Sequence, residues 1–336
     1  YSLLDGLAKI PKLVEKVKEF GMGAIAITDH GGMYGVIPFY FACRNNDVKP
    51  IIGMEGYMST RSRFDKQAAI DNDQYHITLI VKNEEGYKNL MKLASRAHLE
   101  GYYYKPRIDW ELLEKYKEGL IVLSGCLNGQ LGQLVQTGEV AKAREAAKKF
   151  LDLFSEDYYL EVQRHPNIPK QEEVNQALIK ISRELGIPIV ATADLHYVEQ
   201  KEAAAQDILL AIQTQRKVVD KDRLSMIDSP DFYLKSPDEM TALFADLPEA
   251  IGNSVKIAEK CDLTINTGQW ILPRFPIPEG ETAVTHLKDL ISERFPPRYP
   301  DLTKEQKEQL EKRIKYELEV IESKGFETYF LIVQDL

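Results

Sequence analysis

Short apolar segments recur along this chain, and each ends in a residue that can bind a metal. The clearest is residues 187–197, IPIVATADLHY, whose apolar part is rich in β-branched side chains and follows Gly186. Apolar runs of this length are typical of strands that are buried on both faces of a parallel sheet. Four further segments have the same character: residues 23–32, 50–57, 120–126 and 158–165.

Amphipathic segments lie between these predicted strands. Residues 7–17, 84–98, 140–154 and 171–185 each carry apolar side chains at three- and four-residue spacing, which predicts helices with one buried face. A strand, a loop and a helix repeated in this way predict an α/β fold with a parallel sheet or barrel. In such folds the functional residues gather at the carboxyl ends of the strands.

Five predicted strands end in potential metal ligands, which are His30, Glu55, Cys126, His165 and the pair Asp194 and His196. A helix-capping Asp followed by a surface His explains the last pair equally well when that stretch is considered alone. Core packing does not explain why five predicted strands all end in potential metal ligands, because packing would place Val or Leu at those positions as readily. A mixture of imidazole, carboxylate and thiolate suits zinc, manganese or iron better than magnesium or calcium.

The remaining candidates fit this pattern less well. Asp5 precedes a helical segment and needs no function beyond starting that helix. His76 stands at the beginning of its predicted strand, residues 76–81, so a strictly parallel sheet would place it at the opposite edge. Spacing alone therefore predicts that His76 is a surface histidine or one whose hydrogen bonds are satisfied within the fold. His98 and His286 lie in helical patterns, and we expect both to be structural.

Composition restricts the function classes. The chain has 336 residues, enough for one large α/β barrel and a smaller piece. Three widely spaced cysteines argue against a disulfide framework and for a reducing compartment. We see no signal peptide and no membrane-spanning apolar run, so we expect a cytoplasmic protein. The net charge is −9, whereas surfaces that bind nucleic acid by themselves are positively charged. Contacts with DNA would therefore lie mainly outside this chain.

Six motifs in order along the chain resemble a known family. They are ITDHGGMYG, GMEGY, YHITLIV, LSGCLNG, EVQRHP and VATADLHY, and they look like the amino-terminal PHP (polymerase and histidinol phosphatase) domain of bacterial DNA polymerase III alpha subunits. Residues 317–336 are similar to the start of the polymerase palm region, which stand-alone phosphatases of the superfamily lack. The resemblance implies a distorted seven-stranded (β/α) barrel of the PHP type, followed by a mainly helical segment.

The resemblance also implies that two or three divalent ions of zinc, manganese or iron are bound by Asp5, His30, Glu55, His76, Cys126, Asp194 and His196. Asp5, His30 and His196 would hold one ion. Glu55 would bridge two ions, His76 and Cys126 would complete the second, and Asp194 would belong to a third. His76 would then be a ligand, contrary to the prediction from strand direction.

His165 and Arg164 resemble positions near the family's metal cluster. We expect them to bind metal or phosphate and to act in catalysis, with Arg164 holding a phosphate oxygen. In the family a His-x-His pair on a first strand comes just before YSLLDG, so we expect that strand and two ligands to be missing from this chain. The paired aspartates that hold Mg for nucleotidyl transfer are also absent, so this piece would not polymerise DNA by itself.

We place the PHP domain at residues 1–270, with the barrel at about 1–215 and a closing helical segment at 216–270. That segment contains predicted helices near residues 237–247 and 247–260. Residues 271–336 form a linker and the start of the palm region, with a helix at 303–323. Seven residues are expected to break regular structure in the linker: Pro273, Pro276, Pro278, Gly280, Pro296, Pro297 and Pro300.

The family's activity is DNA-directed DNA synthesis, and its partners are DNA, a proofreading exonuclease subunit, the sliding clamp and other replisome subunits in the cytoplasm at the nucleoid. Two functions stay open for the barrel itself. It is either a metal-dependent phosphoesterase with 3′-5′ exonuclease activity or a non-catalytic scaffold for the proofreading exonuclease subunit. A stand-alone histidinol-phosphatase-like enzyme is disfavoured by the carboxyl-terminal resemblance.

Overall fold

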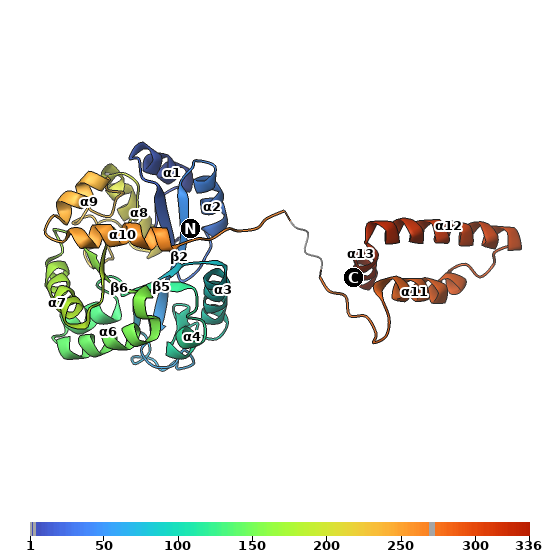
Figure 1. Ribbon diagram of the computed structural model, residues 1–336, viewed down its shortest axis with the longest axis horizontal. Coiled ribbons are helices and arrows are strands. Elements are labelled where there is room, and N and C mark those ends of the chain that lie inside the picture. Colours follow the sequence, from blue (N-terminus) through green and yellow to red (C-terminus); the bar gives the residue numbers. More distant parts are fainter. Residues whose placement is uncertain (1, 3–4, 269–272) are drawn as a thin grey trace. The chain divides into compact units, whose positions relative to one another are not determined.

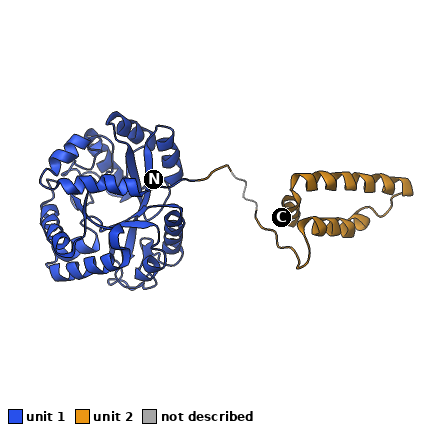
Figure 2. Cartoon of the chain, viewed as in Figure 1, with its two compact units in different colours: residues 1–265 blue, residues 266–336 orange. Residues whose placement is uncertain are grey.

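A computed structural model describes residues 2, 5–268 and 273–336. The chain divides into two compact units, residues 1–265 and residues 266–336 (Figure 2). None of the described helices is long and apolar enough to cross a membrane.

The first unit is built on a seven-stranded mixed sheet. Its strands are β1 (Ala24–His30), β2 (Lys49–Ser59), β3 (Gln74–Val81), β4 (Arg107–Ile108), β5 (Leu120–Leu123), β6 (Tyr158–Gln163) and β7 (Ile189–Thr192). The strand order is β1-β2-β3-β5-β6-β7, and β4 pairs with β2. The sheet curls (Figure 1). Among the described residues no pairing joins β1 to β7, so it forms a half-barrel and not a closed barrel. The α/β prediction is confirmed, whereas the two-residue strand β4 was not predicted.

The direction of β3 differs from our expectation. It runs antiparallel to both of its neighbours, β2 and β5, whereas β1 with β2, β5 with β6, and β6 with β7 are parallel. The beginning of β3 therefore lies at the edge where β2 and β5 end. His76 pairs with Tyr57 there, two residues beyond Glu55. The prediction that His76 lies at the opposite edge was wrong, because it assumed that every strand is parallel.

The ten α-helices described in the first unit surround this sheet (Figure 1). They are α1 (Ile10–Glu19), α2 (Val36–Arg44), α3 (Glu84–Leu99), α4 (Trp110–Lys115), α5 (Gln130–Gln136), α6 (Val140–Phe154), α7 (Pro169–Leu185), α8 (Ala203–Gln213), α9 (Pro237–Leu243) and α10 (Pro248–Lys260). Side-chain caps start several of them, such as Asn83 at α3 and the capping box of Ser236 with Glu239 at α9. Helix α9 ends at Leu243, four residues earlier than predicted.

Helix α10 closes the half-barrel at the edge where most strands begin. Ile257 and Cys261 of this helix pack in one buried cluster with Ile51, Ile121 and Val190 from the strands. The side-chain amide of Asn253 also donates a 2.8 Å hydrogen bond to the carbonyl of Ile189. These contacts fill the interior from one end and leave the carboxyl edge of the sheet for polar side chains.

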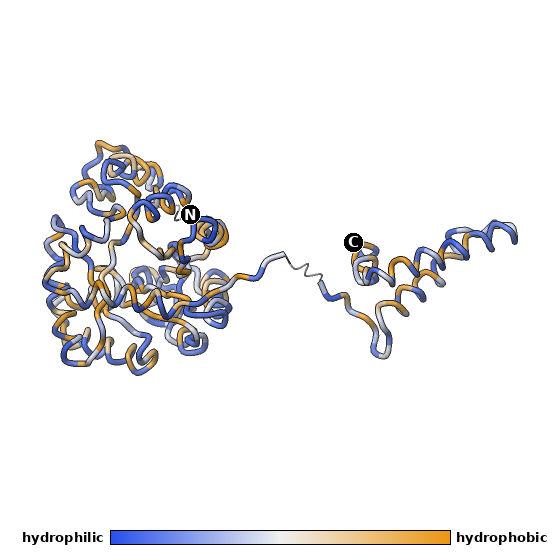
Figure 3. Tube along the Cα trace, turned by 45° about the horizontal axis from the view of Figure 1, so that its top comes forward, coloured by the Kyte–Doolittle hydropathy of each residue, from blue (hydrophilic) through white to orange (hydrophobic). Residues whose placement is uncertain are grey.

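The second unit is a small helical group of α11 (Ala283–Arg298), α12 (Lys304–Lys324) and α13 (Glu327–Asp335). The prediction that Pro296 and Pro297 lie in irregular chain was wrong, because α11 includes both. They stand in its last turn, where few hydrogen bonds are lost, and Thr282 caps its start. Helix α12 is largely hydrophilic (Figure 3).

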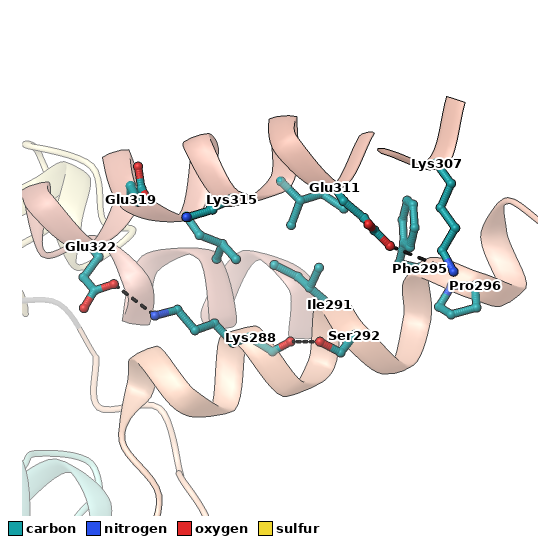
Figure 4. A pocket seen from close by; sticks show the side chains of 12 residues that line it. Lys288, Ile291, Ser292, Phe295, Pro296, Lys307, Glu311, Lys315, Glu319 and Glu322 are labelled. Atoms are coloured by element: carbon teal, nitrogen blue, oxygen red, sulfur yellow. Dashed lines mark hydrogen bonds and ion pairs between the residues drawn. The ribbon is translucent and has the colours of Figure 1, made fainter. Parts of the chain in front are cut away.

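A groove of about 540 Å³ lies between α11 and α12 (Figure 4). The alkyl chains of Ile291 and Ile314 line it, and Lys288 pairs with Glu322 at 3.1 Å across it. None of the predicted metal ligands lines this groove. It is therefore separate from the candidate site described next.

Candidate metal centre

The predicted ligands come together at the carboxyl edge of the half-barrel. Most follow from strand ends: His30 is the last residue of β1, Glu55 lies in the second half of β2, and His76 lies near the start of the antiparallel β3. Cys126 follows β5, and Asp194 and His196 follow β7. The strand-end argument predicted this edge for His30, Glu55, Cys126, Asp194 and His196, but not for His76.

Asp5 reaches this edge because its segment lies beside the residues that follow β7. The backbone N–H of Leu7 donates to the carbonyl of His196 at 2.7 Å, and Gln206 donates to the carbonyl of Asp5 at 3.2 Å. Asp5 then contacts two imidazoles: its carboxylate lies 3.0 Å from His30 Nε2 and 3.4 Å from His196 Nε2. One ligand atom from each of these three residues lies within 4.8 Å of the others, a spacing that fits a divalent ion with nitrogen and oxygen ligands.

Glu55 connects this trio to the rest of the cluster. Its Oε1 lies 2.7 Å from His30 Nδ1 and 3.1 Å from His76 Nδ1. His76 Nδ1 in turn lies 3.6 Å from Cys126 Sγ. One carboxylate oxygen is thus shared by two imidazoles, which is the arrangement expected of a carboxylate that serves two neighbouring metal positions.

Asp194 and His196 extend the cluster on the other side. The Nδ1 of His196 donates to the Asp194 carbonyl at 2.7 Å, which leaves Nε2 to face Asp5. Backbone bonds of this kind fix the tautomer of metal-binding histidines. Asp194 has a left-handed backbone, with φ of 48°, a conformation that Asp tolerates better than most residues. Its Oδ1 lies 3.8 Å from His196 Nδ1.

Electrostatics couple the imidazoles to their acidic neighbours. Burial would lower the pKa of His30, but the hydrogen bonds to Asp5 and Glu55 raise it to about 10. Burial likewise opposes the charge on His196, whereas Asp194 and Asp5 raise its pKa to about 9. The pKa of Asp5 is lowered by the two imidazoles despite its burial. A divalent cation that binds here must therefore displace protons from His30 and His196.

Burial shifts two further groups towards the neutral form. Burial raises the pKa of the Cys126 thiol, and the charges of Asp194 and Glu55 raise it further. Burial also raises the pKa of Asp194. Positive charge beside either group would reverse this preference, because a coordinating thiol is deprotonated by its metal.

The structure places His165 and Arg164 outside this cluster of contacts. The ring of His165 stacks on Phe232 at 4.0 Å, and His196 packs on Phe232 at 5.5 Å. Both His165 ring nitrogens are buried without a hydrogen-bond partner among the described residues. Arg164 donates to the Asp246 carboxylate at 2.6 and 2.9 Å and to the Leu243 carbonyl, so α9 and the residues after it hold its guanidinium. A catalytic role for either residue stays a prediction.

The sequence analysis missed Glu161, a buried acid in the middle of β6. It accepts hydrogen bonds from the hydroxyls of Thr78 and Thr192 at 3.0 and 2.6 Å, and burial raises its pKa. Together with Asp194 and Cys126 it lines a cavity of about 300 Å³ that also includes His30, Glu55 and His196. A charged residue inside an otherwise apolar strand was the signal that could have found it.

The fold and the clustered ligands define a PHP domain. Residues 1–165 match the PHP domain family, and residues 285–336 match the bacterial DNA polymerase III alpha NTPase domain family. The DNA polymerase III subunit alpha of Borreliella burgdorferi is 47% identical over 338 residues, and that of Treponema pallidum is 42% identical. Each match covers 100% of this chain and 29% or 28% of the relative. The chain belongs to the family of bacterial DNA polymerase III alpha subunits and spans less than a third of their length.

Solved structures resemble the chain only distantly. An amidohydrolase from Chromobacterium violaceum aligns with 59% of this chain and 85% of its own, at 10% sequence identity and a TM-score of 0.36.

Proposed function

We propose that the cluster binds two or three divalent ions of zinc, manganese or iron and hydrolyses phosphodiester bonds at the 3′ end of DNA. The observation that carries this proposal is the unbroken series of contacts from Cys126 through Glu55 to Asp194. Nitrogen, oxygen and sulfur ligands in one cluster favour transition metals over magnesium or calcium.

Each side chain has a definite part in this proposal. Asp5, His30 and His196 hold one ion, and His76 with Cys126 holds a second. Glu55 would contribute to both positions, since one of its oxygens contacts His30 and His76. Asp194 supplies an oxygen for a third ion. Bound metal in such a site lowers the pKa of water and stabilises charge that develops on the phosphate.

The role in the whole protein follows from the family. We infer that the longer chain is a DNA-directed DNA polymerase of the replisome in the cytoplasm. Its expected partners are DNA, the proofreading exonuclease subunit and the sliding clamp, and its nucleotidyl transfer would use Mg bound by domains that follow Leu336. The PHP domain would then act as a metal-dependent 3′-5′ exonuclease in addition to the proofreading exonuclease subunit.

The test combines elemental analysis with an exonuclease assay on the protein loaded with manganese or zinc. The protein used extends upstream through the His-x-His pair that we expect before Tyr1. With it we expect more than one ion per chain and release of nucleotides from a 3′-ended strand. Asp5→Asn should lower the rate at least about 100-fold, because a metal-positioned water is lost. The matched control Asp238→Asn, at an exposed position on α9, should retain the rate. A chain that binds its metals and still releases no nucleotide would support the scaffold function instead.

A further inference from the structure

Exposed tyrosines gather on two loops beside the candidate metal centre. Tyr34 lies in the loop after β1, and Tyr102 and Tyr104 lie in the loop before β4. Their exposed fractions are 57%, 54% and 67%, although large aromatic side chains are usually buried. We call these three residues the tyrosine rim.

His98 holds the two loops of the tyrosine rim together. Its ring lies edge-on to Tyr34 with 6.4 Å between centroids and stacks on Tyr102 at 6.3 Å. Its Nε2 also lies 3.0 Å from the carbonyl of Gly31 and 3.2 Å from the Tyr34 hydroxyl. Gly31 directly follows His30, so His98 contacts the backbone one residue from a candidate metal ligand.

Tyr57 and Lys105 provide a second connection between rim and cluster. The Tyr57 ring stacks on His30 at 6.5 Å and packs edge-on to His76 at 5.3 Å. Lys105, next to Tyr104 in sequence, places its Nζ 5.1 Å from the centre of the Tyr57 ring. A cation next to Tyr104 in sequence therefore lies over the ring that contacts both imidazoles.

The backbone of Tyr104 gives an independent observation. Its φ of 58° is left-handed, a conformation that costs most side chains roughly 1–2 kcal/mol and that usually selects Gly or Asn. The bridge between Tyr103 and Lys105 closes the turn around it, and the Tyr103 ring packs on Tyr104 at 4.6 Å. The turn thus holds a large aromatic ring in solvent where a smaller residue would be less strained, and strain of this kind concentrates at binding sites.

We propose that the tyrosine rim stacks the bases of single-stranded nucleic acid and directs its 3′ end to the metal centre. Stacking on aromatic side chains next to a cation is how proteins bind single strands without sequence preference. Lys105 is placed to meet a phosphate of the strand as it passes from the rim to the cluster. The inference rests on the proposed phosphodiesterase function, since it assigns the substrate of that same site.

The test compares two fluorescent oligonucleotides of equal length, a short oligothymidylate and its counterpart built from abasic residues. Both carry the same phosphates, so the ratio of their dissociation constants reports the bases alone. Binding is measured by fluorescence anisotropy with a chelator present, so that no hydrolysis occurs. We expect the protein to bind the base-bearing strand at least about fivefold and up to about 150-fold more tightly, the range for one stacked base.

Substitutions assign the preference to the rim. The double variant Tyr102→Leu/Tyr104→Leu keeps apolar side chains but removes two of the three rings, and it should lose most of the preference for the base-bearing strand. Tyr102→Phe/Tyr104→Phe keeps the rings and should keep the preference, and so should Tyr316→Leu, which removes an equally exposed tyrosine from α12. Lys105→Gln should lower the slope of log affinity against log salt by about 0.7, the value for one phosphate contact to a single strand.

The inference is overturned if the unaltered protein binds both oligonucleotides equally, which would favour a protein partner on these tyrosines. It is also overturned if the double leucine variant keeps the preference. The same oligonucleotides with manganese test the proposed function separately. A strand that is bound through its bases but never cleaved would contradict the phosphodiesterase function and leave the nucleobase site standing.

Discussion

Glu55 is the residue on which the arrangement of the candidate ligands depends most. One oxygen of its carboxylate contacts both His30 and His76, so Glu55 lies between the group of Asp5, His30 and His196 and the Cys126 side of the cluster. Burial would raise its pKa, but the hydrogen bond to His30 and the positive charges nearby lower it. It is thus held as a carboxylate, the form that binds metal.

Replacing Glu55 should cost more metal than replacing a terminal ligand. Glu55→Ala removes a contact to two metal positions, so the bound metal should fall below one ion per chain. His76→Ala should mainly weaken one position, by about 10- to 100-fold or more. Elemental analysis after gel filtration measures both, with Glu84→Ala at an exposed site on α3 as control. Equal metal content in the Glu55 and His76 variants would contradict the shared role of Glu55.

His165 should make the protein sensitive to mild acid. Burial lowers its pKa from 6.5 to about 4, with smaller contributions from Lys235 and His196, so the folded protein binds this proton more weakly than the unfolded chain. Stability is therefore fully present above pH 6.5 and is lost as the pH falls towards 4, by up to about 3 kcal/mol.

Urea unfolding between pH 7 and pH 4.5, measured without added metal, tests this. His165→Phe should flatten the decline in the free energy of unfolding, because its ring cannot be protonated and no hydrogen bond is lost. Tyr102→Phe, which alters an exposed ring of the same unit, should leave the decline unchanged. The assignment to His165 fails if the His165→Phe protein keeps the full acid sensitivity.

At the scale of elements, the turn after β5 sets the distance between Cys126 and His76. Gly125 in this turn has φ of 84°, and a Cβ on it would lie 2.4 Å from the carbonyl oxygen of His76. His76 also donates its backbone N–H to the carbonyl of Asn128 at 2.9 Å. The turn thus packs directly against the start of β3, which places the thiol beside the imidazole.

Gly125→Ala should destabilise the protein far more than Gly138→Ala. Both glycines have left-handed backbones, but a Cβ on Gly138 would meet nothing within 4 Å. Gly138→Ala should cost about 1–2 kcal/mol from backbone strain alone. Gly125→Ala adds a backbone clash and should cost about 2–5 kcal/mol, as measured by urea unfolding at pH 7. Equal costs would show that the turn moves freely away from β3.

Some of the helices and strands could be predicted from the sequence, and others could not. Helix α6 was predicted to the residue, and the strand that ends in His30 was predicted within two residues at either end, because local periodicity defines them. Strand β2 runs four residues past Glu55, where we expected it to end. The reversed direction of β3 depends on pairing with β2 and β5, which spacing along the chain does not encode. Only the family resemblance placed His76 at the cluster.

Two other misses have local physical causes. Strand β4 has two residues, too few to produce a period. Helix α11 was hidden by Pro296 and Pro297, since proline usually ends a helix, whereas in the last turn it removes few hydrogen bonds. The exposed position of Tyr104 depends on its left-handed backbone conformation. A tyrosine in the sequence does not predict that conformation.

At the scale of the whole molecule, the two units differ in how much apolar surface they bury. The first unit has a large core of buried side chains, whereas Leu287 and Leu331 are the buried apolar residues among those described in the second unit. Helix α12 has no buried residue. Because helices gain most of their stability from packing, the second unit should open locally far more often than the first.

Hydrogen exchange followed by mass spectrometry tests this difference and its link to metal. Amides of α12 should exchange orders of magnitude faster than those of β2, β3 and β5. Manganese at about 1,000 times its dissociation constant should stabilise the folded first unit by about 4 kcal/mol. The most protected strand amides, which exchange through global unfolding of that unit, should then slow by about 1,000-fold, while α12 stays unchanged.

Glu55→Ala supplies the matched control for this experiment, because it should abolish the slowing in the strands without affecting α12. Slowing of equal size in α12 would show that the two units unfold together. Slowing that persists in the Glu55→Ala protein would place the metal elsewhere than the carboxyl edge of the half-barrel. We expect metal to slow exchange in the strands only when Glu55 is present, and to leave exchange in α12 unchanged. This result requires that the two units unfold independently and that the metal binds at the cluster.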